Sequence, residues 1–173
     1  MRVLFVVKEF DVEPLGSMYL SAALQKDGHE VNIATASDVF TEMELFKPHI
    51  IGFSAMTGSQ NSLLKLGREI KNNFDVISIM GGPHPTFFPE VIEEPGLDMI
   101  CIGEGEGAIV DLANRMERGD PLEDIKNLWI KKDGNIIKNG IRPFISDLDS
   151  IPFPDRTFTS KYQKGREWPI SYF

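Results

Sequence analysis

Short apolar runs alternate along the chain with longer stretches in which apolar residues recur at helical spacing. The short runs are rich in Val, Ile and Phe and are too short to be buried helices; they cover residues 3–7, 31–34, 50–54, 76–80 and 99–102. The longer stretches cover residues 16–27, 60–73 and 106–118, with shorter helical candidates at 38–46 and 85–93. This pattern predicts five strands that alternate with helices.

The alternation predicts a doubly wound α/β fold with a five-stranded parallel sheet. Parallel strands joined by right-handed helical crossovers are covered on both faces, and such strands are apolar throughout instead of following a period of two. Ligands of these sheets bind beyond the carboxyl ends of the strands, next to the point where the strand order reverses. The loops that follow the strands are therefore the places to look for function.

The pattern changes after residue 120. Two strand-like runs, 128–131 and 135–138, flank Lys132-Asp133-Gly134, and an Asp-Gly turn between such runs predicts a hairpin. A proline-rich tail follows, with Pro143, Pro152, Pro154 and Pro169 interleaved with Phe144, Phe153, Phe158, Trp168, Tyr172 and Phe173. Such a segment cannot form its own core and should lie along a surface. We expect an α/β domain at residues 1–126 and a hairpin with a proline-rich linker at residues 127–173.

Composition narrows the functional classes. A chain of 173 residues with 42% hydrophobic residues can bury one core. The net charge of −8 and the scattered Lys and Arg residues argue against a nucleic-acid partner. The single cysteine, Cys101, excludes an internal disulfide and any multi-cysteine cluster or zinc site made by this chain alone. No apolar run reaches the roughly 18 residues of a membrane span, so we expect a cytoplasmic protein without one.

The loop after the first strand carries Asp11, Glu13, Leu15 and Gly16. It lacks the Gly-x-Gly-x-x-Gly turn that would cradle a dinucleotide pyrophosphate, and its carboxylates would repel a flavin phosphate. A solvated loop in which Pro14 and Gly16 set the entry to a helix would also account for it.

The loops after the third and fourth strands carry small and polar residues. Ser54 stands where a phosphorelay receiver would need an Asp, and Thr57 could either cap the next helix or contact a ligand. Gly81 and Gly82 indicate that something approaches the backbone closely. His84, between two prolines, is more typical of a surface or hydrogen-bonded histidine than of a metal ligand.

The loop after the fifth strand is Gly103-Glu104-Gly105-Glu106-Gly107 and leads into a helix. The glycines indicate a ligand against the helix N-terminus, whereas the two carboxylates oppose an anionic ligand. A neutral, amide-bearing ligand fits this loop better. Favourable interaction with the helix dipole would explain one of the glutamates without any ligand.

Taken in order, these loops resemble the cobalamin-binding domain family, whose pattern is Asp-x-His-x-x-Gly, then Ser-x-Leu, then Gly-Gly. The aligned residues are Asp11 to Gly16, Ser54-Ala55-Met56 and Gly81-Gly82. Glu13 replaces the histidine that ligates cobalt, and Met56 replaces the leucine. Together with Gly103-Glu104-Gly105-Glu106 and Ile151-Pro152-Phe153-Pro154-Asp155-Arg156, the chain is similar to the N-terminal part of cobalamin-dependent radical SAM proteins, in which the histidine is commonly absent.

The resemblance implies a flavodoxin-like or Rossmann-like domain that holds cobalamin base-off and His-off, with no metal ligand from the protein and no catalytic residue of its own. The cofactor-binding residues that it implies are Asp11, Glu13, Leu15, Gly16, Ser54, Met56, Thr57, Gly81, Gly82, His84, Gly103 and Glu104. The parent protein would be a methyltransferase or a related radical SAM enzyme acting on a small molecule. Its [4Fe-4S] cluster and S-adenosylmethionine would belong to a radical SAM domain beyond residue 173.

Two other functions stay open at this point. The same architecture could be a flavodoxin-like module for a flavin or nucleotide, which the acidic first loop disfavours. It could also be a non-catalytic interaction domain whose terminal aromatic residues, Trp168, Tyr172 and Phe173, dock a partner.

Overall fold

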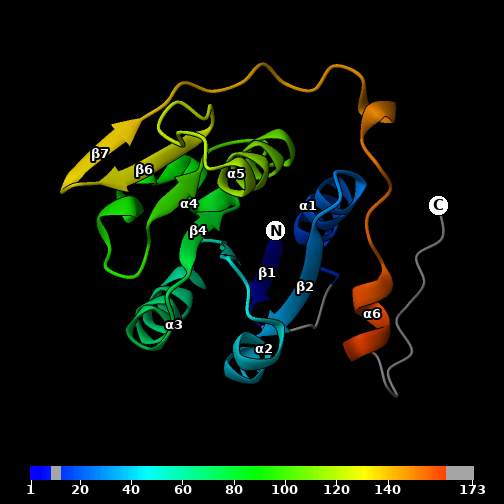
Figure 1. The fold of residues 1–173 in the computed structure, drawn as a ribbon, viewed down its shortest axis with the longest axis horizontal. Coiled ribbons are helices and arrows are strands. Elements are labelled where there is room, and N and C mark those ends of the chain that lie inside the picture. Colours follow the sequence, from blue (N-terminus) through cyan, green and yellow to red (C-terminus); the bar gives the residue numbers. More distant parts are fainter. Residues whose placement is uncertain (9–12, 163–173) are drawn as a thin grey trace.

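The computed structural model describes residues 1–8 and 13–162 of the chain. Within this part, one mixed sheet has seven strands in the order β2-β1-β3-β4-β5-β6-β7 (Figure 1). The parallel strands are β1 (Arg2–Val7), β2 (Glu30–Thr35), β3 (Ile50–Ser54), β4 (Ile77–Gly81) and β5 (Met99–Cys101), and the antiparallel ones are β6 (Leu128–Lys132) and β7 (Asn135–Lys138). The strand order reverses between β1 and β3, as in flavodoxin-like sheets.

The predicted α/β class, parallel strands and hairpin are all present, but the prediction of a five-stranded sheet is wrong. The hairpin does not stand apart, because β6 pairs with β5 through Met99↔Ile130 and Ile100↔Trp129 and so extends the sheet. Asp133 and Gly134 both have positive φ, 49° and 76°, as a tight two-residue hairpin turn requires. The domain boundary at residue 126 stays a prediction.

Helices cover both faces of the sheet, as the apolar strands indicate. The helical elements are α1 (Leu15–Lys26), α2 (Val39–Phe46), α3 (Gln60–Asn73), α4 (Pro83–Phe87), the 3-10 helix η1 (Pro89–Glu93), α5 (Glu106–Arg118), the 3-10 helix η2 (Leu148–Ser150) and α6 (Thr157–Tyr162). The predicted helix at 85–93 is divided into α4 and η1. Pro89 offers no N–H and disfavours helical geometry at Phe88, where the helix breaks.

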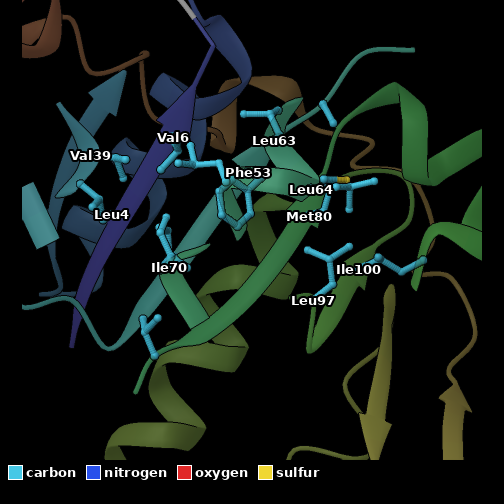
Figure 2. Packing of buried hydrophobic residues seen from close by; sticks show 14 of the residues in the cluster. Leu4, Val6, Val39, Phe53, Leu63, Leu64, Ile70, Met80, Leu97 and Ile100 are labelled. Carbon is cyan, nitrogen blue, oxygen red and sulfur yellow. The ribbon is translucent and has the colours of Figure 1, made fainter. Parts of the chain in front are cut away.

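Two buried clusters lie on opposite faces of the sheet because successive strand residues point in opposite directions. Val3, Phe5 and Val7 pack with α1 and α5, whereas Leu4 and Val6 pack with α2 and α3. Figure 2 shows this second cluster, in which Leu4, Val6, Val39, Phe53, Leu63, Leu64, Ile70, Met80, Leu97 and Ile100 come together. None of the helices in the described part of the chain is long and apolar enough to cross a membrane.

Residues 139–156, which we call the strap, run from the hairpin past α5 and α1 to α6 at the other side of the sheet (Figure 1). The strap is fastened to α1 by Asp155, which accepts hydrogen bonds from Ser21 Oγ and Gln25 Nε2, both at 2.8 Å. The proline-rich segment therefore lies along the surface of the α/β layers, as its composition indicates. The predicted aromatic positions Trp168, Tyr172 and Phe173, and also Pro169, fall outside the described residues.

Candidate functional site

A cavity of about 350 Å³ lies at the carboxyl ends of the parallel strands, on the face covered by α1 and α5. We call it the slot. Its lining is mostly apolar and consists of Phe5, Gly16, Ser17, Leu20, Gly52, Phe53, Ser54, Ile79, Gly81, Gly82, Cys101, Gly103, Glu104, Gly105, Glu106, Ile109 and Phe144. Its position at the ends of β1 and β3, where the strand order reverses, is where such folds bind their ligands.

Two glycines, Gly52 and Gly81, line the sheet side of the slot, and each leaves space that a Cβ would fill. A Cβ on Gly52 would lie 2.8 Å from Cδ1 of Phe5, so this glycine allows the Phe5 ring to lie across β3. A Cβ on Gly81 would meet only the Cβ of Cys101, at 3.8 Å. The space above Gly81 is therefore open, and its missing side chain leaves room for a ligand.

Gly82 also lines the slot, but its conformation is a backbone requirement. Its φ is +100°, and a Cβ there would lie 2.8 Å from the carbonyl oxygen of Ala55. The same two loops are joined by backbone hydrogen bonds from Ala55 N to Gly81 O and from His84 N to Ala55 O. Gly82 therefore allows the loops after β3 and β4 to pack together. The sequence predicted that this glycine lines a ligand site, but it did not predict this backbone role.

The loop after β5 is fixed by hydrogen bonds from the Asn127 side chain. This residue is 1% exposed, and its Nδ2 donates to the carbonyl oxygens of Ile102 and Glu104 at 2.7 and 3.2 Å. Its Oδ1 accepts from the backbone N–H of Arg142 in the strap, at 2.9 Å. One buried side chain thus fixes both the Gly103–Glu104 wall of the slot and the start of the strap.

The strap supplies one wall of the slot. The Glu104 carboxylate accepts a hydrogen bond from the backbone N–H of Ile145 at 2.9 Å, and the neighbouring Phe144 lines the slot. Glu104 is therefore placed at the slot as predicted, but one of its oxygens already has a partner.

Six of the predicted site residues line the slot together: Gly16, Ser54, Gly81, Gly82, Gly103 and Glu104. Leu15 and Met56 do not line it; they are exposed, at 45% and 67%, in the segments that follow β1 and β3. Their apolar side chains are therefore available at the same end of the sheet, outside the slot.

Thr57 and His84 lie outside the slot and bond to each other. Thr57 Oγ1 is 3.1 Å from Nδ1 of His84, and the His84 ring stacks on Phe88 with centroids 5.4 Å apart. His84 is 8% exposed. Of the surface and hydrogen-bonded forms that the sequence favoured, His84 has the hydrogen-bonded one and is not on the surface.

Glu13 lies just before α1 and faces the strap. Its Oε1 is 3.7 Å from Nε of Arg156, and its side chain is about one-third exposed. The carboxylate that replaces the family's histidine is thus close to a guanidinium group. Asp11, which was also predicted at the site, lies outside the described residues.

The sequence reasoning missed the helix side of the slot. Ser17 and Leu20 follow Gly16 on α1, and Ile109 belongs to α5. A signal exists for Leu20, because the position four residues after a helical glycine lies on the same face of the helix. Ser17, the residue directly after Gly16, had no such signal. Phe144 had no local signal, since its place depends on the path of the strap.

Glu104 and Glu106 are the charged residues among those that line the slot. Burial raises the pKa of the Cys101 thiol to about 12, so this lining residue stays neutral at physiological pH. Ser17 is 2% exposed, and its hydroxyl has no hydrogen-bond partner among the described residues. The described residues contain no group of three or more His, Cys, Asp or Glu side chains that could hold a metal ion. The slot thus fits a flat, largely apolar group with few polar atoms.

Known proteins share this fold and parts of this sequence. An uncharacterized methyltransferase of Pyrococcus horikoshii is 34% identical over 151 residues, covering 82% of this chain and 33% of that protein. The cobalamin-dependent S-adenosylmethionine radical enzyme OxsB, with aqua-cobalamin and S-adenosylmethionine bound, superposes with a TM-score of 0.74 at 21% identity, over 89% of this chain and 24% of OxsB.

A second solved structure gives the same picture. The radical S-adenosylmethionine methyltransferase TsrM of Kitasatospora setae, with cobalamin and a [4Fe-4S] cluster bound, has a TM-score of 0.68 at 18% identity, over 91% of this chain and 32% of TsrM. At these identities the two enzymes show a shared fold. The chain spans about a third of the length of the curated relative and of TsrM, and about a quarter of OxsB.

The family is shown by the N-terminal part of the chain. Residues 1–113 match the B12 binding domain family, and they include every lining residue of the slot except Phe144. The resemblance drawn from the loops is therefore confirmed, and cobalamin is the cofactor that this family binds. The chain belongs to the B12 binding domain family.

Proposed function

We propose that this domain holds cobalamin with the nucleotide tail in the slot and the corrin ring across the slot's mouth. The observation that carries the proposal is the slot itself: an apolar, glycine-lined cavity at the strand ends with one unpartnered buried hydroxyl. Ligand pockets range from about 300 to about 1,000 Å³, and this cavity of about 350 Å³ lies near the lower end of that range. It therefore accepts an aromatic base and excludes the wide corrin ring.

The apolar residues around the mouth support this arrangement. Leu15 and Met56 are exposed in the segments after β1 and β3, and Phe144 of the strap is 83% exposed while it also lines the slot. Exposed apolar side chains clustered at one end of a fold are typical of a binding surface. They would pack against the apolar face of the corrin.

The bound cobalamin would be base-off and His-off. With its base in the slot, the tail is displaced from cobalt. The chain has three histidines, His29, His49 and His84, and none of them lines the slot. Glu13 lies beside Arg156, and a carboxylate is a harder, less suitable partner for cobalt than imidazole.

The larger enzyme would be a methyltransferase or a related radical SAM enzyme that acts on a small molecule. Methylcobalamin would supply the methyl group, and a radical SAM domain of the same parent chain, with a [4Fe-4S] cluster and S-adenosylmethionine, would generate the substrate radical. The residues of this domain would bind the tail, orient the corrin and leave the upper face of cobalt open to that domain. Support comes from the Pyrococcus horikoshii relative and from TsrM, of each of which the chain spans about a third.

One titration tests the cofactor and its ligation together. We expect hydroxocobalamin to bind and to raise the melting temperature, because a ligand that binds only the folded state stabilises it by about 2.7 kcal/mol at a hundred times its Kd. Electron paramagnetic resonance of the bound cobalt(II) form should show no splitting from an axial nitrogen. Flavin mononucleotide, added in parallel, should leave the melting temperature unchanged.

Each readout has its own contrary result. If saturating cobalamin leaves both its own spectrum and the melting temperature unchanged, the domain does not hold this cofactor. Stabilisation by the flavin alone would favour the flavodoxin-like alternative. A triplet splitting that disappears in the His84→Ala variant would make His84 the lower ligand and end the His-off proposal.

A further inference from the structure

The middle of the strap, residues 143–153, is attached to the domain more weakly than the two ends of the strap. At one end, Arg142 donates its backbone N–H to Asn127 Oδ1 and forms an ion pair with Asp111, both at 2.9 Å. At the other end, Asp155 accepts two hydrogen bonds from α1. None of residues 143–153 is buried. We call this middle segment the gate.

Within the described part of the chain, two hydrogen bonds join the gate to the α/β layers. The Ile145 N–H donates to Glu104 Oε2 at 2.9 Å. Lys26 Nζ lies 3.5 Å from the carbonyl oxygen of Ser150, which is at the limit of a hydrogen bond. The remaining hydrogen bonds of the gate are internal and lie at η2. The bond from Ile145 to Glu104 is therefore the main polar contact that keeps the gate in place.

A cavity separates much of the gate from α1 and α5. This space has a volume of about 430 Å³, and the gate residues that line it are Ile145, Ser150, Ile151 and Pro152. The gate is thus not packed onto the two helices along its length. Segments with few buried apolar contacts and an exposed backbone open locally at a low cost in free energy.

Phe144 connects the gate to the slot. This side chain lines the slot although it is 83% exposed. The other lining residues belong to the sheet, to α1 and α5, or to the loops that follow the strands. Phe144 is therefore the part of the lining that can move away without disturbing the core.

We propose that the gate is a lid with hinges at Arg142 and Asp155, which opens to admit the nucleotide tail of the cofactor. The bond from Ile145 to Glu104 holds the gate closed both before and after binding. In the closed position, Phe144 covers the ligand in the slot and shields it from water, as lids do in other proteins. The inference rests on the proposed function for the identity of the ligand, but the opening itself is a property of the ligand-free chain.

The first test uses Cys101 to report opening without any cofactor. This residue is the single cysteine of the chain, lines the slot and is 7% exposed. We expect a methanethiosulfonate reagent to modify it about tenfold faster in Glu104→Ala, because losing one hydrogen bond to a charged group raises the open population by about that factor. Mass spectrometry measures the rate of modification.

The electrostatics of Cys101 do not account for such a change. Burial and the nearby Glu106 raise the pKa of the thiol, and Arg142 lowers it, whereas Glu104 is not among the groups that shift it. Faster modification in Glu104→Ala would thus report access to the slot. Asp149→Ala is the control, because Asp149 is an exposed carboxylate of the gate itself and should leave the rate unchanged.

The second test separates a gate from a contact to the ligand, using stopped-flow binding of cobalamin. A bond that closes the gate in the free and the bound protein slows association and dissociation alike, so we expect both rate constants to rise about tenfold in Glu104→Ala while the dissociation constant stays the same. A lost contact to the ligand would instead raise mainly the dissociation rate. Glu104→Gln keeps the size of the side chain and a weaker acceptor oxygen, so both rates should rise less.

Failure of the inference can be distinguished from failure of the proposed function. If the wild type binds no cobalamin, the proposed function falls, and the modification of Cys101 still decides whether the gate opens. Equal modification rates in the wild type and Glu104→Ala, or weaker binding with an unchanged association rate, would overturn the inference alone. So would faster modification that accompanies a lower melting temperature, or wild-type rates in Glu104→Gln, since the cause would then be unfolding or a wider slot.

Discussion

At the scale of single residues, the adjacent glycines of the slot have different tasks. Gly82 adopts a positive φ and leaves no room for a Cβ beside the Ala55 carbonyl, whereas Gly81 has open space above it. A side chain at Gly82 would therefore strain the backbone of any fold with this turn. A side chain at Gly81 would instead occupy the cavity.

Gly81→Val is accordingly the sharper test of the slot. The valine side chain would enter the space that we assign to the nucleotide tail, and we expect cobalamin affinity to fall by at least about tenfold, or about 1.4 kcal/mol. Gly140→Val is the control, because a Cβ there meets no atom within 4 Å and the residue lies on the strap, outside the slot lining. Spectral titration measures the cobalamin affinity of both variants. Unchanged affinity in Gly81→Val would show that the nucleotide tail does not occupy the slot.

The sequence could indicate some of these residues but not what each one does. The glycine pair and the Gly103–Glu104 loop stand out because adjacent glycines and acidic turns are locally unusual. Ser17 and Asn127 do not stand out, since nothing in the sequence shows that a hydroxyl lacks a partner or that an amide joins two distant segments. Whether a hydroxyl is paired, and which segments an amide joins, depends on residues that are distant in the sequence. Asn127 and Ile102, for example, are hydrogen-bonded although they are 25 positions apart.

At the scale of elements, the strap is held to the domain by Asp155. This residue is 9% exposed, its backbone N–H donates to the carbonyl oxygen of Met18, and its carboxylate accepts from Ser21, Gln25 and Thr157. Burial opposes ionisation, but the hydrogen bonds from Thr157, Ser21 and Gln25 lower the pKa of Asp155. The ionised form is therefore the one that fastens the strap.

Asp155→Asn should destabilise the protein at neutral pH by about 1–2 kcal/mol, because hydrogen bonds to a charged group contribute more than neutral ones. A carboxyl with a lowered folded-state pKa stabilises above the pKa of the unfolded chain, about 3.9, and this contribution is lost as pH falls through the folded-state value. The difference between wild type and variant should thus shrink below about pH 4.

Urea denaturation at neutral and acid pH measures this difference. Asp149→Asn is the control, because Asp149 is an exposed carboxylate of the same strap and should change stability little at either pH. A difference between wild type and Asp155→Asn that is the same at both pH values would show that the charge of Asp155 is not what fastens the strap.

Local patterns were sufficient for the elements themselves. Apolar runs and helical spacing placed β1 to β5 and the three long helices close to their observed bounds, since both signals are read within a few residues. The pairing of β6 with β5 was not predictable in this way, because a hairpin carries no local mark of the sheet edge that it joins. The break between α4 and η1 could have been predicted from Pro89.

At the scale of the whole molecule, the chain has the parts for one cofactor. It has a single cysteine, which is buried, whereas a [4Fe-4S] cluster is held by several thiolates. We expect the cobalamin-loaded chain to retain no iron after anaerobic reconstitution and to form no 5′-deoxyadenosine from S-adenosylmethionine. Stoichiometric binding of iron by this chain alone, or its cleavage of S-adenosylmethionine, would contradict the proposal that the cluster and S-adenosylmethionine belong to another domain.

Helix α6, which follows the strap, protects an edge of the sheet. β2 is the outermost parallel strand, and α6 lies beside it: Lys161 Nζ and Tyr162 OH donate to the carbonyl oxygen of Ile33 at 2.9 and 3.0 Å. Side chains from beyond the strap thus pair a carbonyl at an edge that would otherwise be open to another chain.

The fastening of α1 by Asp155 has a consequence for the order of folding. The bond from Ser21 to Asp155 joins residues 134 positions apart, and contacts between distant positions form late because the chain must first pay the entropy of closing the loop. During synthesis, α1 can pack on β1 and β2 long before residue 155 has been made. We therefore expect the nascent domain to pass through a state whose sheet is assembled while the slot still lacks its Phe144 wall.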